Sequence, residues 1–210
     1  KHDVLFVADE VICGFGRTGN MWGSQTYDIR PDLLTCAKQL SSAYAPIAAL
    51  LIADHVYQTV ADRSDELGTL GMGYTYGGHP VAAAVALKTL DIYEQDGIID
   101  HVRAVAPHFQ ARLAALGDDP LVGEARGVGL IGALEIVADK ASRAQFPATA
   151  KMAAQITEAC LEEGLILRPL PGDVVGICPP LIIRADEIDA LFDRLERGLA
   201  RVHAARRAAA

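Results

Sequence analysis

Cysteine and positive charge are both scarce in this sequence, and each scarcity excludes a class of protein. The 210 residues include only 4 cysteines, none in a Cys-x-x-Cys pair, so we expect neither a metal site nor a disulfide framework. A reducing compartment, the cytoplasm, is the expected location. The formal net charge is −8, without the basic face of a nucleic-acid-binding protein.

Long hydrophobic runs are also absent, although 51% of the residues are hydrophobic. No stretch approaches the roughly 20 apolar residues of a membrane-spanning helix, and no signal-peptide pattern is present. We therefore expect a globular protein without a membrane partner. The chain begins with Lys1 rather than Met, and an apolar segment follows almost at once, so we expect further sequence upstream.

Two apolar segments end close to residues with ionisable side chains. Residues 4–11 are predicted to form a buried, parallel strand that contains Asp9, and residues 33–37 a second strand directly followed by Lys38. Ligands of open α/β sheets bind beyond the carboxyl ends of the strands. We therefore predict that Asp9 and Lys38 point into one pocket and hold a cofactor that requires a carboxylate and an amine.

The first glycine-rich segment, residues 14–19, matches the dinucleotide-binding pattern G-x-G-x-x-G. That fingerprint requires a helix that opens at the glycines and an acidic residue about 20 positions later. Residues 20–24 show no helical period and contain another glycine. A glycine-rich excursion near the ligand is therefore favoured over a Rossmann site.

A second glycine-rich segment, residues 68–78, surrounds Thr75 and precedes Pro80, which fits the first turn of a helix. Backbone N–H groups in such a segment can approach an anion closely. A phosphate site and a purely structural turn are both compatible with this pattern.

The remaining pattern predicts a change of architecture along the chain. The first part holds a strand at 47–53, a helix at 54–67 capped by Asp54, and helices that follow Pro80 up to Gly117, with Pro107 inside the second. The second part holds strands at 127–137, 165–167 and 174–178, a helix at 149–163, and a final helix with the apolar stripe Ile188, Leu191, Phe192, Leu195, Leu199 and Val202.

Three blocks in this order resemble the class III, or omega, aminotransferases, which are pyridoxal-phosphate enzymes of fold type I. The first block joins residues 6–11 and the glycine turn to residues 32–38, the second covers 74–81, and the third combines 165–170 with 174–183. The resemblance implies an α/β fold. Residues 1–110 would be the remainder of a large cofactor-binding domain with a mostly parallel sheet, and residues 111–210 a small α+β domain.

The resemblance also implies pyridoxal 5'-phosphate as cofactor and a role for five residues. Lys38 would bond to the cofactor aldehyde and then carry protons. Asp9 would pair with the protonated pyridine nitrogen, and Val11, on the same strand face as Asp9, would pack against the ring. Thr75 would bind the phosphate, usually that of the partner subunit. Arg168 would bind the substrate carboxylate.

The activity implied by the resemblance is transfer of an amino group from an omega-amino acid or amine to a keto acid such as pyruvate, in a homodimer with shared active sites. An aminomutase or decarboxylase of the same family would share Lys38 and Asp9, so this alternative stays open. A fragment that acts only as a dimerising domain is a third possibility, because the family's N-terminal phosphate loop is not in this chain. Glu10 and His79 are interpreted as structural residues.

Overall fold

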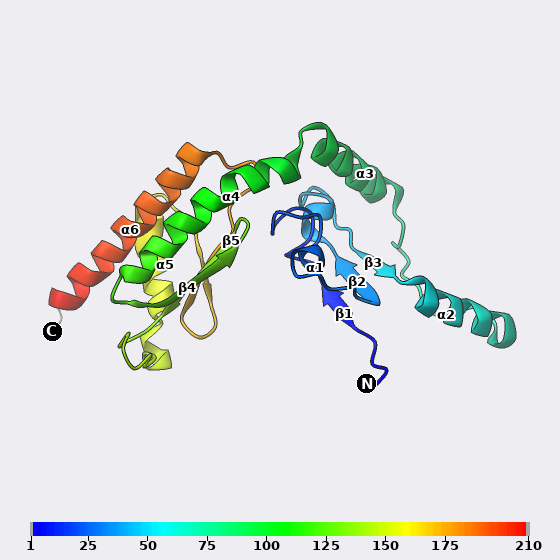
Figure 1. Cartoon of the computed structure of the whole chain (residues 1–210), viewed down its shortest axis with the longest axis horizontal. Coiled ribbons are helices and arrows are strands. Elements are labelled where there is room, and N and C mark those ends of the chain that lie inside the picture. The colour runs from blue at the N-terminus through cyan, green and yellow to red at the C-terminus, as the bar shows by residue number, and fades with distance from the viewer. Residues whose placement is uncertain (1, 209–210) are drawn as a thin grey trace. The chain divides into compact units, whose positions relative to one another are not determined.

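The structure is a computed structural model that describes residues 2–208 (Figure 1). The chain divides into two compact units, Lys1–Asp100 and His101–Ala210, and helix α4 (Ile98–Ala115) crosses the division. The sequence-based boundary after residue 110 falls inside the same helix and stays a prediction. Among the described residues, no helix combines the length and the apolar character needed to cross a bilayer.

The first unit contains a three-stranded sheet in the order β1-β2-β3 (Figure 1). Strand β1 (Val7–Asp9) runs parallel to β2 (Leu33–Cys36), and β2 runs antiparallel to β3 (Ala49–Ile52). The expectation of a mostly parallel sheet is therefore wrong for these strands. The connection from β2 to β3 contains only the short 3-10 helix η1 (Lys38–Leu40) and no crossover helix, so the chain returns in the opposite direction.

Three α-helices complete the first unit: α1 (Gly23–Thr26), α2 (Asp54–Leu67) and α3 (Pro80–Gln95). Helix α3 begins at Pro80, as predicted from the fixed φ of proline. The prediction that Asp54 caps α2 is wrong, because Ala53 is the N-cap residue and Asp54 is already helical. An acidic side chain in the first turn still complements the helix dipole.

Strands β1 and β3 of the first unit are largely exposed, which contradicts the prediction of a buried strand at residues 4–11. The strand itself covers only Val7–Asp9, and the Phe6 side chain just before it is 46% exposed. All four residues of β3 are exposed, and α2 has no buried residue. A continuous apolar run does predict a strand that is meant to be covered. No described element of this unit covers β1 or β3.

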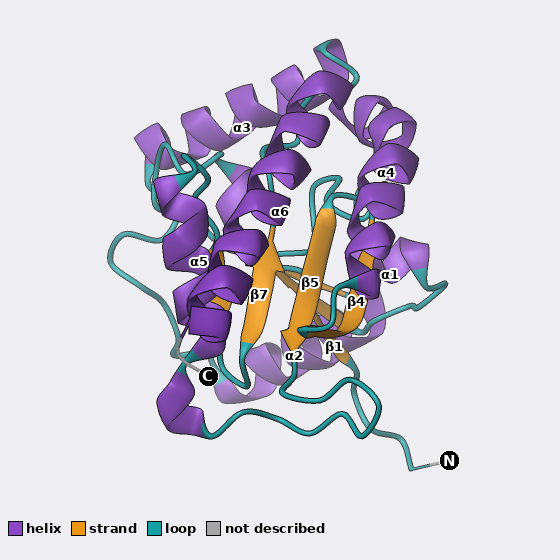
Figure 2. Ribbon diagram, turned by 90° about the vertical axis from the view of Figure 1, so that its left-hand side faces the viewer, coloured by secondary structure: helices purple, strands orange, loops and turns teal. Residues whose placement is uncertain are grey.

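The second unit is a four-stranded antiparallel sheet in the order β4-β5-β7-β6. Helices α4, α5 and α6 lie on one face of this sheet (Figure 2). Strand β5 alternates between buried and half-buried side chains, as expected for a strand with one covered face. The bounds are β4 (Val122–Val128), β5 (Ile131–Ile136), β6 (Arg168–Leu170), β7 (Val174–Ile177), α5 (Met152–Glu162) and α6 (Ala185–Ala208), with 3-10 helices η2 (Leu116–Asp118) and η3 (Ala148–Ala150).

Two predicted strands of the second unit are wrong in detail. The single strand expected at 127–137 is a hairpin, because the chain turns between β4 and β5 at Gly129, whose φ is +56°. The strand expected at 165–167 is a loop, and pairing with β7 begins only at Arg168. Both differences depend on which residues find a partner strand, and a short apolar run does not show this.

The predicted apolar stripe of α6 packs into the core of the second unit. Phe192 is 0% exposed, and its ring centroid lies 5.2 Å from that of Phe109 on α4. Residues spaced three and four apart line one face of a helix, and this spacing recurs from Ile188 to Val202. The two helices therefore share one hydrophobic contact surface.

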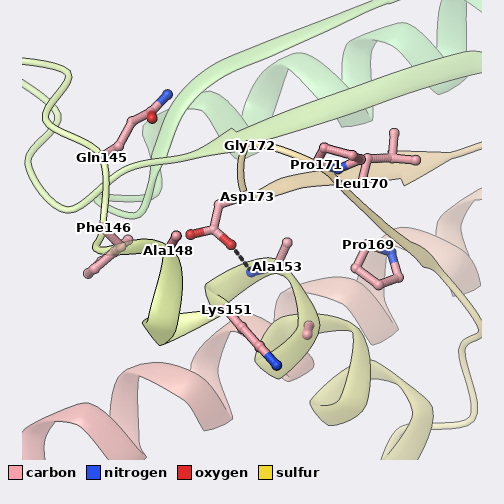
Figure 3. A pocket seen from close by; sticks show the side chains of 11 residues that line it. Gln145, Phe146, Ala148, Lys151, Ala153, Pro169, Leu170, Pro171, Gly172 and Asp173 are labelled. Carbon is pink, nitrogen blue, oxygen red and sulfur yellow. Dashed lines mark hydrogen bonds between the residues drawn. The ribbon is translucent and has the colours of Figure 1, made fainter.

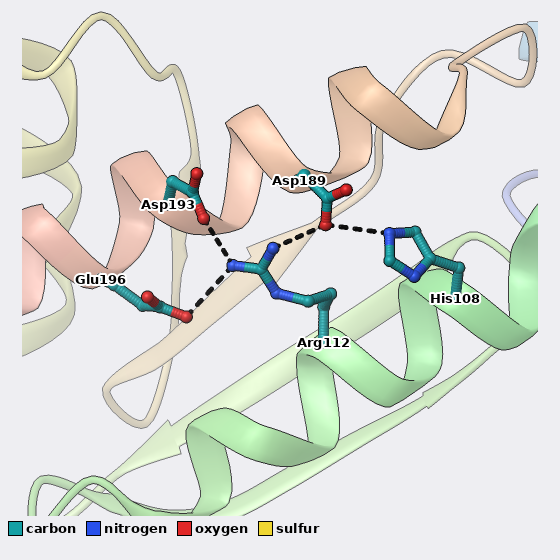
Figure 4. Close-up of polar contacts among 5 residues, drawn as sticks. All are labelled: His108, Arg112, Asp189, Asp193 and Glu196. Carbon is teal, nitrogen blue, oxygen red and sulfur yellow. Dashed lines mark hydrogen bonds and ion pairs between the residues drawn. The ribbon is translucent and has the colours of Figure 1, made fainter.

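A group of charged side chains, which we call the α4–α6 clamp, joins the same two helices (Figure 4). Arg112 donates to Asp189 at 2.6 Å, to Asp193 at 2.8 Å and to Glu196 at 3.2 Å. The ring of His108 contacts Asp189 at 2.9 Å. The hydrogen bond from Arg112, together with that from His108, holds the pKa of Asp189 below its ordinary value.

Candidate functional site

Asp9 and Lys38 lie at the same edge of the sheet in the first unit. The parallel register pairs Asp9, the last residue of β1, with Thr35, and Lys38 follows Thr35 by three residues. Three residues span at most about 10 Å and neighbouring strands lie about 5 Å apart, so the Cα atoms of Asp9 and Lys38 are within about 15 Å. Both residues are exposed, and a ligand at this edge can therefore reach them.

The Asp9 carboxylate is held by two groups of the chain. The backbone N–H of Val11 donates to Oδ1 at 3.0 Å, and the Thr35 hydroxyl lies 3.4 Å from the same oxygen. Neither contact uses Oδ2. Thr35 was not singled out by the sequence, because its position opposite Asp9 follows only from the pairing of β1 with β2.

Glu10 has a structural role in the turn that follows β1. Its carboxylate is 3% exposed and accepts hydrogen bonds from the backbone N–H groups of Gly23, at 2.8 Å, and Ser24, at 2.6 Å. These are free N–H groups of the first turn of α1, which a carboxylate satisfies well. Glu10 thereby joins the end of β1 to the start of α1, on either side of the glycine-rich segment.

The glycine-rich segment at residues 14–19 consists of turns and does not open a helix. Its Phe15 packs edge-on against Trp22, with ring centroids 4.9 Å apart, and both side chains help to bury the turn. The geometry therefore agrees with an excursion beside the strand end and not with a dinucleotide-binding turn.

Lys38 occupies an unusual backbone conformation. Its φ is +47°, in the left-handed region that residues other than glycine rarely adopt, and the lysine begins the 3-10 helix η1. The carbonyl of Lys38 accepts from the N–H groups of Ser41, at 3.2 Å, and Ala43, at 3.3 Å. Strained residues of this kind cluster at functional sites, although strain alone does not establish one.

Val11 lies beyond the end of β1, in a turn, and is half-buried. The expectation that strand alternation puts it on the same face as Asp9 is therefore wrong, because the strand ends at Asp9. What the structure shows for Val11 is the backbone hydrogen bond to the Asp9 carboxylate. Its packing against a cofactor ring stays a prediction.

Thr75 lies in an exposed turn just before α3. The turn is closed by the hydrogen bond from the N–H of Gly77 to the carbonyl of Tyr74, at 2.9 Å. His79 is the N-cap residue of α3 but makes no side-chain capping bond, and Pro80 follows. An exposed hydroxyl beside a helix N-terminus suits a phosphate oxygen, and this role stays a prediction.

Arg168 belongs to the second unit, where it is the first residue of the edge strand β6 and pairs with Gly176 of β7. Its side chain is exposed. A guanidinium on an edge strand can bind a carboxylate with two parallel hydrogen bonds. The structure places Arg168 on a regular element, and its role toward a substrate stays a prediction.

A hollow of about 280 Å³ in the second unit lies between the start of α5 and the turn after β6 (Figure 3). Asp173 points toward the helix, and its Oδ1 accepts the N–H of Ala153 at 3.1 Å. The acidic side chain in the hollow therefore satisfies a free N–H group in the first turn of α5, whose N-cap residue is Lys151. None of the sequence-predicted site residues lines this hollow.

The chemistry of the residues at the edge of the β1–β2 pair fits pyridoxal phosphate. The cofactor requires a primary amine, a carboxylate for its ring nitrogen and donors for its phosphate. Lys38 supplies the amine from the start of η1, just after β2, and Asp9 supplies the carboxylate from the end of the parallel strand β1; both are exposed. Thr75 and the N-terminus of α3 are groups of the kind that bind phosphate, in the same unit.

Comparisons with known proteins define the class first. Two solved structures, a transaminase with L-alanine and the PMP-bound form of an aminotransferase from Vibrio fluvialis, match this chain with TM-scores of 0.93 and 0.92. They are 48% and 40% identical to it and are matched over 97% and 96% of this chain. The fold is therefore that of transaminases.

The family follows from the sequence. The model of the class-III aminotransferases matches residues 1–199. The mitochondrial gamma aminobutyrate transaminase 1 of Solanum lycopersicum is 44% identical over 192 residues, which are 91% of this chain. The chain belongs to the class-III aminotransferase family. It spans less than half of each protein compared here: 37% of the tomato enzyme, and 48% and 44% of the two structures.

Proposed function

We propose that the protein containing this chain is a pyridoxal-phosphate-dependent aminotransferase. The observation that carries the proposal is the parallel register of β1 and β2, which puts Asp9 and Lys38 at one edge of one sheet. When bound, pyridoxal phosphate supplies an electron sink for the carbanion formed at the substrate carbon. The residues of this chain bind it, orient it and move the protons.

Each proposed residue has a separate task. Lys38 Nζ would hold the cofactor through its aldehyde group and would carry a proton to and from the substrate carbon. Asp9 would keep the ring nitrogen protonated by accepting a hydrogen bond from its N–H, and Val11 would pack against the ring. Thr75 binds the phosphate, and Arg168 binds a substrate carboxylate. The exposure of Asp9, Lys38, Thr75 and Arg168 supports roles that require contact with a ligand.

The proposed reaction moves an amino group from an omega-amino acid or amine to a keto acid such as pyruvate. The matched relative named for gamma aminobutyrate supports the omega-amino acid, and the matched transaminase with L-alanine supports pyruvate, the keto acid that corresponds to alanine. In this proposal, residues 1–110 are the remainder of the large cofactor-binding domain and residues 111–210 the small α+β domain.

A homodimer with shared active sites is part of the same proposal. The whole segment from Gly71 to Pro80, with Thr75 at its centre, is exposed, and Tyr74 and Tyr76 are 82% and 80% exposed. Exposed aromatic side chains of this kind are enriched at protein interfaces. Sedimentation of the natural protein should show a dimer, and a monomer that keeps full activity at high dilution would contradict this part.

A reducing compartment such as the cytoplasm is also part of the proposal. Cys36, Cys160 and Cys178 are free thiols, and Cys36 and Cys160 are buried. Burial raises the pKa of the Cys160 thiol to about 11, so this side chain stays neutral and inert at physiological pH. Free thiols of this kind are usual where disulfides do not form.

The experiment is a spectroscopic and kinetic comparison of Lys38→Ala with the natural full-length protein. The natural protein should show a bound-cofactor absorption band that shifts when an amine donor is added. Lys38→Ala should lower turnover by about 10²–10⁴-fold or more, because both the covalent attachment and the proton carrier are lost. Turnover at the natural rate in this variant would refute the proposal.

A matched control is Lys88→Ala, an exposed lysine of α3 in the same unit, which should retain natural turnover. Product analysis separates the alternatives of the same family. A transaminase consumes one keto acid for each amine, whereas an aminomutase turns over without net consumption of an acceptor, and a decarboxylase releases carbon dioxide. Arg168→Ala should raise the KM for carboxylate substrates while that for a simple amine stays unchanged.

A further inference from the structure

Thr35 is the residue whose contacts single it out beyond the proposed active-site set. It pairs with Asp9 in the parallel register of β1 and β2. Its hydroxyl lies 3.4 Å from Asp9 Oδ1, and its carbonyl accepts the N–H of Glu10 at 2.9 Å. One residue of β2 therefore holds both the side chain of Asp9 and the backbone that follows it.

We propose that Thr35 is a positioning residue that orients the Asp9 carboxylate toward the ring nitrogen of the cofactor. The proposal rests on the proposed function. A carboxylate held by only one donor can still rotate about its Cβ–Cγ bond, and donors from two directions restrict that rotation. The N–H of Val11 and the hydroxyl of Thr35 approach the same oxygen, Oδ1. Oδ2 is then the oxygen that accepts the ring N–H.

The Thr35 hydroxyl is not needed to build strand β2, as the length of its contact with Asp9 indicates. A well-formed hydroxyl–carboxylate bond is about 2.7 Å long, so a contact of 3.4 Å contributes little to folding. The ladder bonds of β2 are made by backbone groups and do not require a hydroxyl. The proposed role of Thr35 is therefore in the orientation of the Asp9 carboxylate and not in the stability of the strand.

The test measures pyridoxal-phosphate affinity and the pH dependence of the bound-cofactor absorption band in the natural full-length protein. Thr35→Val keeps the side-chain shape and the strand preference but removes the donor. It should weaken cofactor binding by about three- to tenfold, the size of one ordinary intramolecular hydrogen bond. It should also shift the pH midpoint of the absorption change in the same direction as Asp9→Asn, by a smaller amount.

Two further variants separate positioning from a general loss of stability. Thr35→Ser restores the hydroxyl and should return affinity and midpoint to near-natural values. Thr157→Val removes a part-buried hydroxyl of α5 that donates only to the Ala154 carbonyl, at 3.0 Å, and should change neither. If Thr35→Val does not fold, Thr35→Ala is compared with Thr35→Ser in its place.

The outcomes distinguish the two proposals. If Asp9→Asn changes the absorption band and Thr35→Val leaves both affinity and midpoint unchanged, the role of Thr35 is refuted and the proposed function stands. The same holds if Thr35→Ser does not restore what Thr35→Val loses. If neither Asp9→Asn nor Lys38→Ala alters the band, the proposed function itself is refuted.

Discussion

The two units differ in how completely each one buries its own apolar residues. In the second unit, Phe109, Phe192 and Leu195 are fully buried between helices and sheet. In the first unit, Leu51 on β3 is 44% exposed, and Val4 before β1 is 80% exposed. Large contiguous apolar surfaces usually mark places where other structure binds. The second unit therefore has a self-contained core, whereas the first, which carries Asp9 and Lys38, leaves large apolar side chains of its sheet exposed.

The largest expected effect tests this contrast directly. Phe192→Ala should lower the free energy of unfolding of the natural protein by about 3–5 kcal/mol, because it leaves a cavity beside Phe109. Leu51→Ala should cost less than about 1 kcal/mol, because the Leu51 side chain is 44% exposed. Chemical denaturation measures both. A loss for Leu51→Ala that approaches that of Phe192→Ala would show that β3 is covered.

Two glycines test the same difference in packing between the units, with smaller expected changes in stability. A Cβ atom on Gly127 of β4 would lie 2.5 Å from the Ile131 carbonyl oxygen and 2.7 Å from Leu113, so Gly127→Ala should cost about 1–3 kcal/mol. A Cβ atom on Gly73 would meet nothing within 4 Å. Gly73→Ala should therefore stay within about 0.5 kcal/mol of the natural protein. Equal melting temperatures for the two variants would contradict the tight packing of β4.

The smallest expected effect concerns the α4–α6 clamp. Because Arg112 lowers the pKa of Asp189, this pair stabilises the folded state at neutral pH. The contribution disappears as the pH falls through the lowered pKa of Asp189, since the protonated carboxyl no longer attracts the cation. Arg112→Gln should therefore lower the urea midpoint at pH 7. The difference from the natural protein should shrink steadily in acid below about pH 4, and a difference that grows there would refute this account.

Local signals in the sequence predict the elements that depend on local physics. Pro80 begins α3 and the stripe of α6 is buried, because proline geometry and helical spacing act over a few residues. Gly164 ends the region of α5 with φ +77°, as a glycine after a helix should. Local signals do not predict structure that depends on pairing with a segment distant in the sequence. Nothing local shows that Gly129 turns the chain into a hairpin.

The candidate site shows the same division. Asp9 and Lys38 are recognisable because each comes close to the end of an apolar run, and the class-III resemblance agrees with the family that matches residues 1–199. The exposure of residues 4–7 could not be predicted, because the apolar run that signals a strand does not say whether a second layer covers it. Thr35 could not be found before β1 and β2 were paired.

The sequence by itself determined the kinds of element, the acid and the amine at the ends of two strands, and the family. Only the tertiary structure decided that Thr35 faces Asp9, that β3 runs antiparallel, and which unit buries its own core. The physical reason is the distance along the chain over which each interaction acts. Helix periods, proline and glycine geometry act within a few residues, whereas strand register and burial depend on segments that meet only when the chain has folded.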